Sequence, residues 1–184
     1  MNTIKKKYSF SEYYQTVLFI KKLMREINAP FAAKIKLPKA PKRRKLVIKP
    51  KHVKSILQKI DKLPYEPMRF RTKADVLIAA TSGLRAEELY NLTLGNIDLD
   101  NRMISLEAEM TKDFEDRITF FSEEAKAALL DYLKNHKSRT LRLFPESNIR
   151  RAFQQLNTNL RIKHMRKFFS QQSDRLGMPT AIKK

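Results

Sequence analysis

The 184-residue sequence contains no cysteine and only three glycines. Without cysteine there is no disulfide framework, no cysteine-based zinc site and no thiol nucleophile. So few glycines also leave no Gly-rich phosphate loop. Its three histidines are scattered and its acidic residues form no recognisable metal-binding set. We therefore expect neither a metal nor another cofactor.

The sequence also lacks an apolar run close to the roughly 20 residues that a membrane-spanning helix needs. No signal peptide is visible at its N-terminus. We expect a cytoplasmic protein that does not insert into a membrane.

Positive charge, in contrast, is in large excess. The sequence has 39 Lys and Arg against 19 Asp and Glu, which gives a formal net charge of +20. This excess exceeds what solubility requires and indicates a polyanionic partner. Nucleic acid is the first candidate and an anionic membrane surface the second. Within nucleic acids, RNA is less favoured than DNA because no stacking-aromatic motif is present.

Much of the charge lies in one proline-containing segment. No acidic residue occurs between Glu26 and Asp61, and the part before Pro50 predicts an extended cationic linker. It could be a solvated tether, extended by like-charge repulsion, or a strap along a DNA backbone. The candidate DNA-binding residues of the linker are Lys36, Lys39, Lys42, Arg43, Arg44 and Lys45.

Hydrophobic periodicity predicts a mainly α-helical fold with a small antiparallel β-sheet. Helices are expected over residues 9–27, 50–60, 69–82, 85–92, 122–136, 147–157 and 162–176. Ser9 and Glu12 have the spacing of a capping box, and Gly83 is the expected C-cap of the helix that precedes it. Alternation over residues 104–110 and again over 117–121 predicts a hairpin with Lys112 at or near its turn.

Four cations on these elements are candidates for chemistry: Arg85, Lys112, Lys163 and Arg166. Taken singly, each is more simply a surface cation. In combination, the segment SGLRAEEL, a lysine on the following hairpin and a basic helix ending in RLG resemble the catalytic domain of tyrosine recombinases, the phage-type integrases. The resembling segment SGLRAEEL matches the family form TGLRxxEL, with Arg85 as its arginine.

The second family box has the form HxLR, with a glycine eleven residues after its arginine. Arg166 and Gly177 have this spacing, which puts Lys163 in the histidine position. That departure resembles the Lys variant found in archaeal virus integrases of the fusellovirus type. On a helix, Lys163 and Arg166 lie about 60° apart, whereas His164 and Arg166 lie about 160° apart. We expect Lys163, rather than His164, to share one phosphate with Arg166.

The resemblance implies DNA breaking and rejoining through a 3'-phosphotyrosyl intermediate. Arg85 and Arg166 would hold the nonbridging oxygens, Lys112 would protonate the leaving 5'-oxygen, and Lys163 would take the acid/base position. The implied partners are double-stranded DNA at recombination sites and other recombinase subunits, as many as four on DNA. The implied location is the cytoplasm or nucleoid of a host cell.

The resemblance also divides the chain. Residues 1–29 would be the last helix of a core-binding domain, 30–49 the linker, and 50–184 a catalytic domain incomplete at its C-terminus. The family's nucleophilic tyrosine follows the second box, and all six tyrosines here precede that box. We therefore expect a fragment without its nucleophile. The alternative is a noncatalytic DNA-binding remnant or regulator of recombination.

Overall fold

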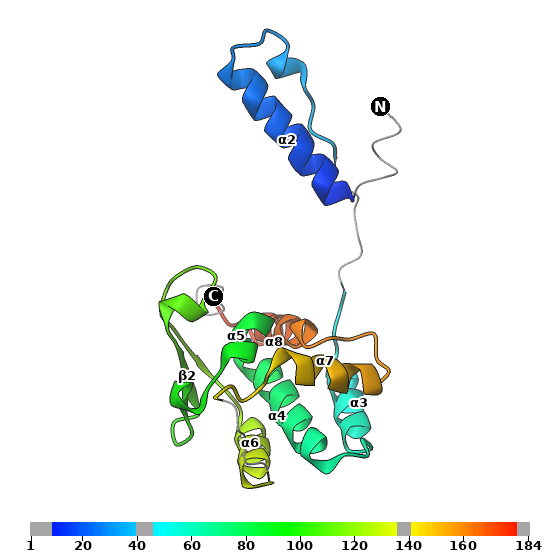
Figure 1. Ribbon diagram of the computed structural model, residues 1–184, viewed down its shortest axis with the longest axis vertical. Helices are drawn as coiled ribbons and strands as arrows, with labels where there is room; N and C mark the ends of the chain where they lie inside the picture. Colours follow the sequence, from blue (N-terminus) through cyan, green and yellow to red (C-terminus); the bar gives the residue numbers. More distant parts are fainter. Residues whose placement is uncertain (1–8, 40–45, 136–140, 180–184) are drawn as a thin grey trace. The chain divides into compact units, whose positions relative to one another are not determined.

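The computed structural model describes residues 9–39, 46–135 and 141–179. It divides into two compact units, Met1–Leu46 (unit 1) and Val47–Lys184 (unit 2), which we describe separately. The predicted fold class is confirmed, because the described residues are mainly helical and include one antiparallel three-stranded sheet (Figure 1). The predicted domain boundaries stay a prediction.

Unit 1 contains α2 (Phe10–Glu26) and the short 3-10 helix η1 (Ala32–Lys34), which pack together. The predicted capping box is present, since the Glu12 N–H donates to Ser9 Oγ (3.3 Å) and the Ser9 N–H donates to Glu12 Oε2 (2.7 Å). No residue of α2 is buried, so its apolar stripe stays accessible.

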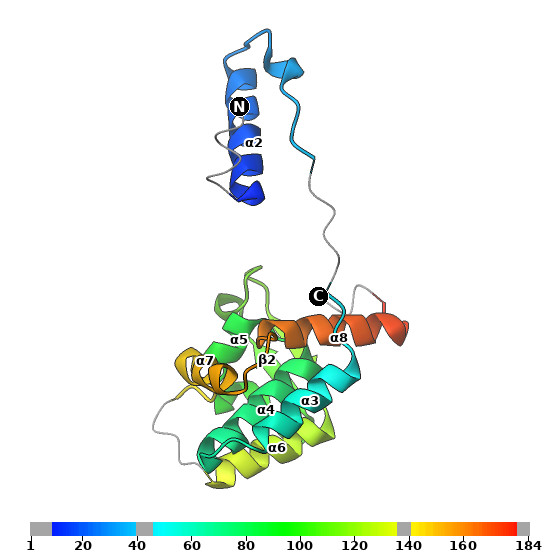
Figure 2. The same cartoon turned by 90° about the vertical axis from the view of Figure 1, so that its right-hand side faces the viewer.

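Unit 2 is built around α4 (Glu66–Ser82). Ten of its 17 residues are buried, including seven in succession from Ala74 to Ala80, so the C-terminal half of this helix is buried on every side. The helices in contact with it are α3 (Pro50–Ile60), α5 (Ala86–Asn91), α6 (Glu123–Asn135), α7 (Glu146–Gln155) and α8 (Lys163–Arg175). Figure 2 shows α8 crossing one end of this layer.

The sheet has the order β1-β2-β3, with strands β1 (Ile97–Asp98), β2 (Met103–Leu106) and β3 (Arg117–Phe120). The β2–β3 pair is the predicted hairpin, and its register places Leu106 opposite Arg117. β1 was not predicted, because two residues are too few to show an alternation.

The predicted alternation through residue 110 was wrong at its end. The chain leaves β2 after Leu106 and forms the 3-10 helix η3 (Ala108–Met110). Polar side chains stabilise this turn: the Ala108 N–H donates to Asp116 Oδ1 at 2.8 Å, and the Glu115 N–H donates to Thr111 Oγ1 at 3.1 Å. These side-chain bonds compete with a continued ladder.

Two glycines end the helices that lead into and out of the candidate site. Gly83 caps α4 as predicted, with φ 70, and a β-carbon there would overlap the ring of Phe169. Gly177, with φ 71, ends α8 in a Schellman arrangement in which the Met178 N–H donates to the Ser173 carbonyl at 2.9 Å.

Candidate phosphate-binding site

Glu88 is the centre of the polar network at the end of α4. It lies on α5 (Ala86–Asn91), and its side chain is 1% exposed. Its Oε1 accepts from Arg85 (3.0 Å) and its Oε2 from Arg117 (2.6 Å). The same Oε2 accepts the backbone N–H of Arg85 at 2.6 Å. One buried carboxylate therefore fixes both the backbone and the guanidinium of Arg85.

Arg166 reaches the same place from α8, where its guanidinium donates to the carbonyl of Gly83. Burial lowers the pKa of Arg166, and the charges of Arg117 and Arg85 lower it further. Glu88 and Asp113 partly offset this effect. We call Arg85, Arg117 and Arg166 the arginine cluster. Three guanidiniums within electrostatic reach of one another have the chemistry needed to bind an oxyanion.

The hairpin turn supplies a second acid to the arginine cluster. Asp113 Oδ2 accepts from Arg85 at 2.7 Å, although the Asp113 side chain is 60% exposed. Burial lowers the pKa of Arg85, but the hydrogen bonds to Asp113 and Glu88 outweigh it, so the net shift is upward. Lys112 directly precedes Asp113 in the chain and is exposed. The turn therefore brings the predicted lysine next to a partner of Arg85.

Lys163 is exposed at the first residue of α8. It lies at the edge of a cavity of about 620 Å³, which Tyr90 of α5 and Phe153 of α7 also line. The side chain of His164, in contrast, is fixed by a hydrogen bond, in which its Nδ1 accepts the backbone N–H of Arg161 at 3.0 Å. Burial, followed by the charges of Lys163, Lys167 and Arg161, lowers the pKa of His164. That Lys163 shares a phosphate with Arg166 stays a prediction.

The linker candidates are only partly described. Lys36 and Lys39 belong to unit 1 and are exposed. The other four, Lys42, Arg43, Arg44 and Lys45, lie outside the described residues. The choice between a solvated tether and a DNA strap stays open.

Arg117 is the residue of the cluster that the sequence interpretation missed, and a signal for it existed. In the strand RITF, alternation puts Arg117 and Thr119 on one face. That face turns inward, as Thr119 Oγ1 donates to the carbonyl of Ser82 at 2.6 Å. An arginine on the inward face of a strand needs an acidic partner, and Glu88 is that partner.

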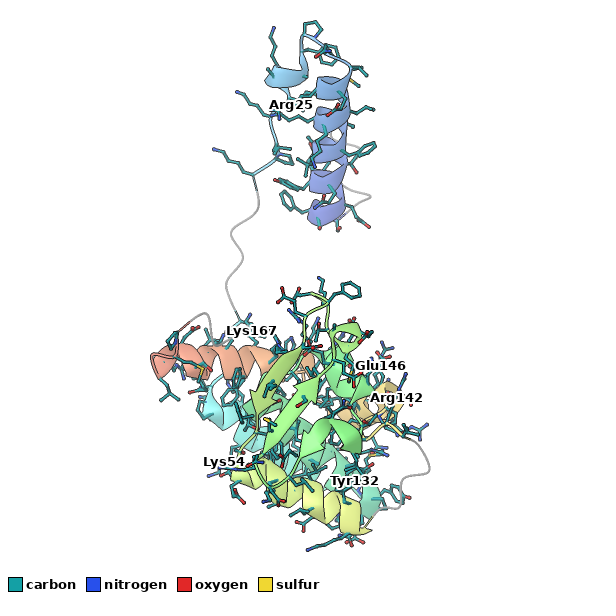
Figure 3. The ribbon with its side chains drawn as sticks, turned by 90° about the vertical axis from the view of Figure 1, so that its left-hand side faces the viewer. Arg25, Lys54, Tyr132, Arg142, Glu146 and Lys167 are labelled. Atoms are coloured by element: carbon teal, nitrogen blue, oxygen red, sulfur yellow. The ribbon has the colours of Figure 1, made fainter. Side chains whose placement is uncertain are left out.

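The three described tyrosines of unit 2 differ in exposure, since Tyr65 is exposed, Tyr90 is half-buried and Tyr132 is buried. Tyr132 is 1% exposed and donates its hydroxyl to the Leu143 carbonyl at 3.1 Å. Figure 3 shows Tyr132 at the end of unit 2 that lies away from α8, on which Lys167 is labelled. Across residues 9–39, 46–135 and 141–179, no group of three or more potential metal ligands occurs. Within the same ranges, no helix is long and apolar enough to span a membrane.

Comparison of the sequence with known proteins identifies relatives of this chain. The sequence model of the phage integrase family matches residues 47–178. The chain is 32% identical over 127 residues to the tyrosine recombinase XerA of Saccharolobus solfataricus, which covers 68% of this chain and 39% of that protein. It is also 32% identical over 82 residues to the tyrosine recombinase XerC of Lactobacillus delbrueckii subsp. bulgaricus, covering 45% of this chain and 27% of that protein. The chain thus spans less than half of the length of each relative.

Solved structures share the fold at lower identity. A crystal structure of XerA recombinase superposes with a TM-score of 0.63 at 20% identity, covering 98% of this chain and 68% of that chain. A variant of the Tn1549 transposon integrase, in complex with transposon right end DNA, gives a TM-score of 0.73 at 17% identity, covering 99% of this chain and 72% of that chain. At such low sequence identity, these superpositions show that the chain shares the fold of those proteins.

Proposed function

The chain belongs to the phage integrase family, and we propose that it binds double-stranded DNA at recombination sites as the phosphate-holding part of a tyrosine recombinase. The observation that carries this proposal is the convergence of Arg85 and Arg166 beside the end of α4. Arg166 donates to the carbonyl of Gly83, which stands 83 residues earlier in the chain. Arg85 is the N-cap residue of α5 and follows this turn closely.

The chemistry of strand cleavage explains why two arginines are suitable. When a tyrosine attacks a phosphodiester, negative charge builds on the two nonbridging oxygens. A guanidinium stays protonated and donates two parallel hydrogen bonds, so it stabilises that charge without exchanging a proton. We assign this role to Arg85 and Arg166. Asp113 would leave Arg85 when the phosphate enters, since its exposed carboxylate can be solvated instead.

The two lysines would handle protons and orientation. Lys112 would donate a proton to the leaving 5'-oxygen, and its place beside Asp113 supports this assignment. Lys163 would take the acid/base position, as in the Lys variant of archaeal virus integrases. The hydrogen bond that His164 Nδ1 accepts from Arg161 supports Lys163 over His164, because this nitrogen is already engaged within the helix start.

The nucleophile and the other subunits complete the proposal. The attacking tyrosine would stand outside residues 1–184, because all six tyrosines precede Lys163. Other recombinase subunits would bind the same DNA, and the linker cations would follow its phosphates. The transposon integrase structure contains bound DNA, which supports a DNA partner by analogy of fold.

Binding to double-stranded DNA as a function of salt tests this proposal. Fluorescence anisotropy should show that log affinity falls against log salt by about 0.9 per phosphate contacted. Replacing Lys36, Lys39, Lys42, Arg43, Arg44 and Lys45 by alanine should flatten this slope. Affinity that does not change with salt would contradict the electrostatic basis of the proposal.

Strand cleavage tests the role of the arginines. DNA sequences that the chain binds best, selected from a random pool, supply a nicked half-site substrate. The chain alone should give no covalent adduct, whereas adding a second chain with only the tyrosine-containing C-terminal segment of the family should give one. That adduct should disappear in Arg85→Ala and Arg166→Ala and persist in Arg69→Ala, which changes an arginine at the opposite end of α4.

The alternative is a noncatalytic DNA-binding regulator of recombination. It is favoured by the pairing of Arg85 with Asp113 and of Arg166 with Gly83, which occupies both arginines with partners from the protein itself. A regulator would bind the selected DNA with the same salt dependence and yet give no adduct when the tyrosine-containing C-terminal segment is added.

A further inference from the structure

Arg117 shares the buried carboxylate of Glu88 with Arg85, although it comes from a different element. It is the first residue of β3, and its side chain is 18% exposed. Its contact with Glu88 Oε2, at 2.6 Å, is shorter than the 3.0 Å contact between Arg85 and Oε1. A charge-assisted bond this short and this buried holds the carboxylate in one orientation.

Because Arg117 shares the Glu88 carboxylate, it determines how much of the positive charge of Arg85 this carboxylate neutralises. A carboxylate and a guanidinium alone tend to form two parallel bonds, which engage both oxygens with one arginine. Here Oε2 is occupied by Arg117 and by the Arg85 backbone N–H, so Oε1 alone bonds the side chain of Arg85. Arg117 therefore leaves more of the Arg85 guanidinium free to bind an anion.

The charge of the site depends on Arg117 as well. Three guanidinium charges against the one buried carboxylate leave two positive charges once the exposed Asp113 has turned away. A phosphodiester carries one negative charge, and the phosphorane formed by attack on it carries two. With Arg117 the arginine cluster matches the phosphorane, and without Arg117 it matches only the diester.

We propose that Arg117 is a positioning residue that, through Glu88, makes the arginine cluster selective for dianionic over monoanionic tetrahedral oxyanions. This inference rests on the proposed function, because it names the charge state that the same site prefers. Arg117 acts by orienting Arg85 and by adding charge near Arg166, and the proposal requires no direct contact between Arg117 and the ligand.

Two small phosphate esters test this selectivity on the complete 184-residue chain. At pH 8 methyl phosphate is a dianion, whereas dimethyl phosphate is a monoanion of similar shape. Titration of the arginine Nε–H signals by NMR gives a dissociation constant for each ester. The wild-type protein should bind methyl phosphate about tenfold more tightly than dimethyl phosphate.

Arg117→Gln should reduce that preference to about twofold, mainly by weakening methyl phosphate binding. Arg117→Lys keeps the charge and should retain an intermediate preference, and it also decides the question if the Gln variant does not fold. Arg69→Gln removes an arginine that pairs with Glu66 at the other end of α4 and should keep the wild-type ratio. An Arg117→Gln protein that is folded and keeps the wild-type ratio would overturn the inference, as would an Arg117→Lys protein with no preference.

These outcomes are separable from those of the proposed function. If DNA binding depends on salt and on Arg85 while the ester ratio ignores Arg117, only the inference fails. If the ester ratio changes as expected but the chain shows no affinity for double-stranded DNA, the proposed function fails and the selectivity of the site stands.

Discussion

Two acidic side chains are buried in unit 2, and their surroundings are opposite. Glu88, on α5, accepts hydrogen bonds from two guanidiniums and a backbone N–H. Asp75, in the middle of α4, is 0% exposed, and neither of its carboxylate oxygens has a hydrogen-bond partner within the part of the chain that the structure describes. Burial raises the pKa of Asp75 well above its ordinary value, although the charge of Arg71 opposes this.

Glu88 holds the arginines of the candidate site in place, whereas Asp75 is buried without a hydrogen-bond partner among the described residues. Arg85 and Arg117 allow the Glu88 side chain to be buried, because their hydrogen bonds replace those to the water that it loses. Asp75 has no such partners and is favoured in its neutral form. Stability should therefore depend on the two residues in opposite ways.

Glu88→Ala is expected to have the largest effect, because it leaves Arg85 and Arg117 without their shared counterion. Breaking a buried ion pair from one side costs about 3–5 kcal/mol, and the partial exposure of both arginines favours the lower figure. Urea unfolding followed by circular dichroism measures the loss. Glu87→Ala is the matched control, since the neighbouring Glu87 is exposed, and it should stay within about 0.5 kcal/mol. Equal losses in the two variants would contradict the role of Glu88.

Gly83→Ala tests the turn on which the arginine cluster is built. The positive φ and the overlap with Phe169 should together cost about 2 kcal/mol. Because Arg166 donates to the Gly83 carbonyl, the same variant should also weaken phosphate binding. Thermal unfolding and phosphate titration measure the two effects. A β-carbon at Gly95 would contact only Thr93 Oγ1, at 3.6 Å, so Gly95→Ala should leave stability and phosphate binding unchanged.

Asp75→Asn tests the other side of the comparison. A carboxyl whose pKa is raised on folding contributes stability below its unfolded pKa and loses that contribution as pH rises through the folded pKa. The Asn variant cannot ionise, so its melting temperature should exceed that of the wild type increasingly as pH rises above about 4, by a few degrees near neutral pH. Asp61→Asn changes an exposed acid and serves as control. A constant difference across the pH range would show that Asp75 does not titrate as described.

Asp113→Asn should have the smallest effect on stability, because an exposed ion pair is worth at most about 1 kcal/mol. Its effect on binding should be larger: Arg85 keeps Glu88 but loses the exposed anion that competes with a phosphate, so affinity for DNA should rise about threefold. Anisotropy at low salt measures this change. Asp100→Asn removes the same charge from the turn at the other end of β2. A similar gain in both variants would mean that net charge, not the pairing with Arg85, is responsible.

Much of the fold could be predicted from short-range patterns. The capping box of α2, the Gly83 end of α4 and the start of α3 at Pro50 each depend on residues a few positions apart. The end of β2 could not be predicted, because the side chains of Thr111 and Asp116 take up the backbone groups that would have continued the strand.

For the site, the sequence by itself determined the boxes that contain Arg85 and Arg166, through local motifs and their spacing. Only the tertiary structure decided that Arg117 joins them, because Arg117 and Glu88 are 29 residues apart and Arg166 and Gly83 are 83 residues apart. Whether a cationic side chain lies free on the surface or belongs to a site depends on which distant carboxylate or carbonyl it contacts in the folded protein. Strand periodicity puts Arg117 on one face with Thr119, but which carboxylate it contacts depends on how α8 and β3 pack against the end of α4.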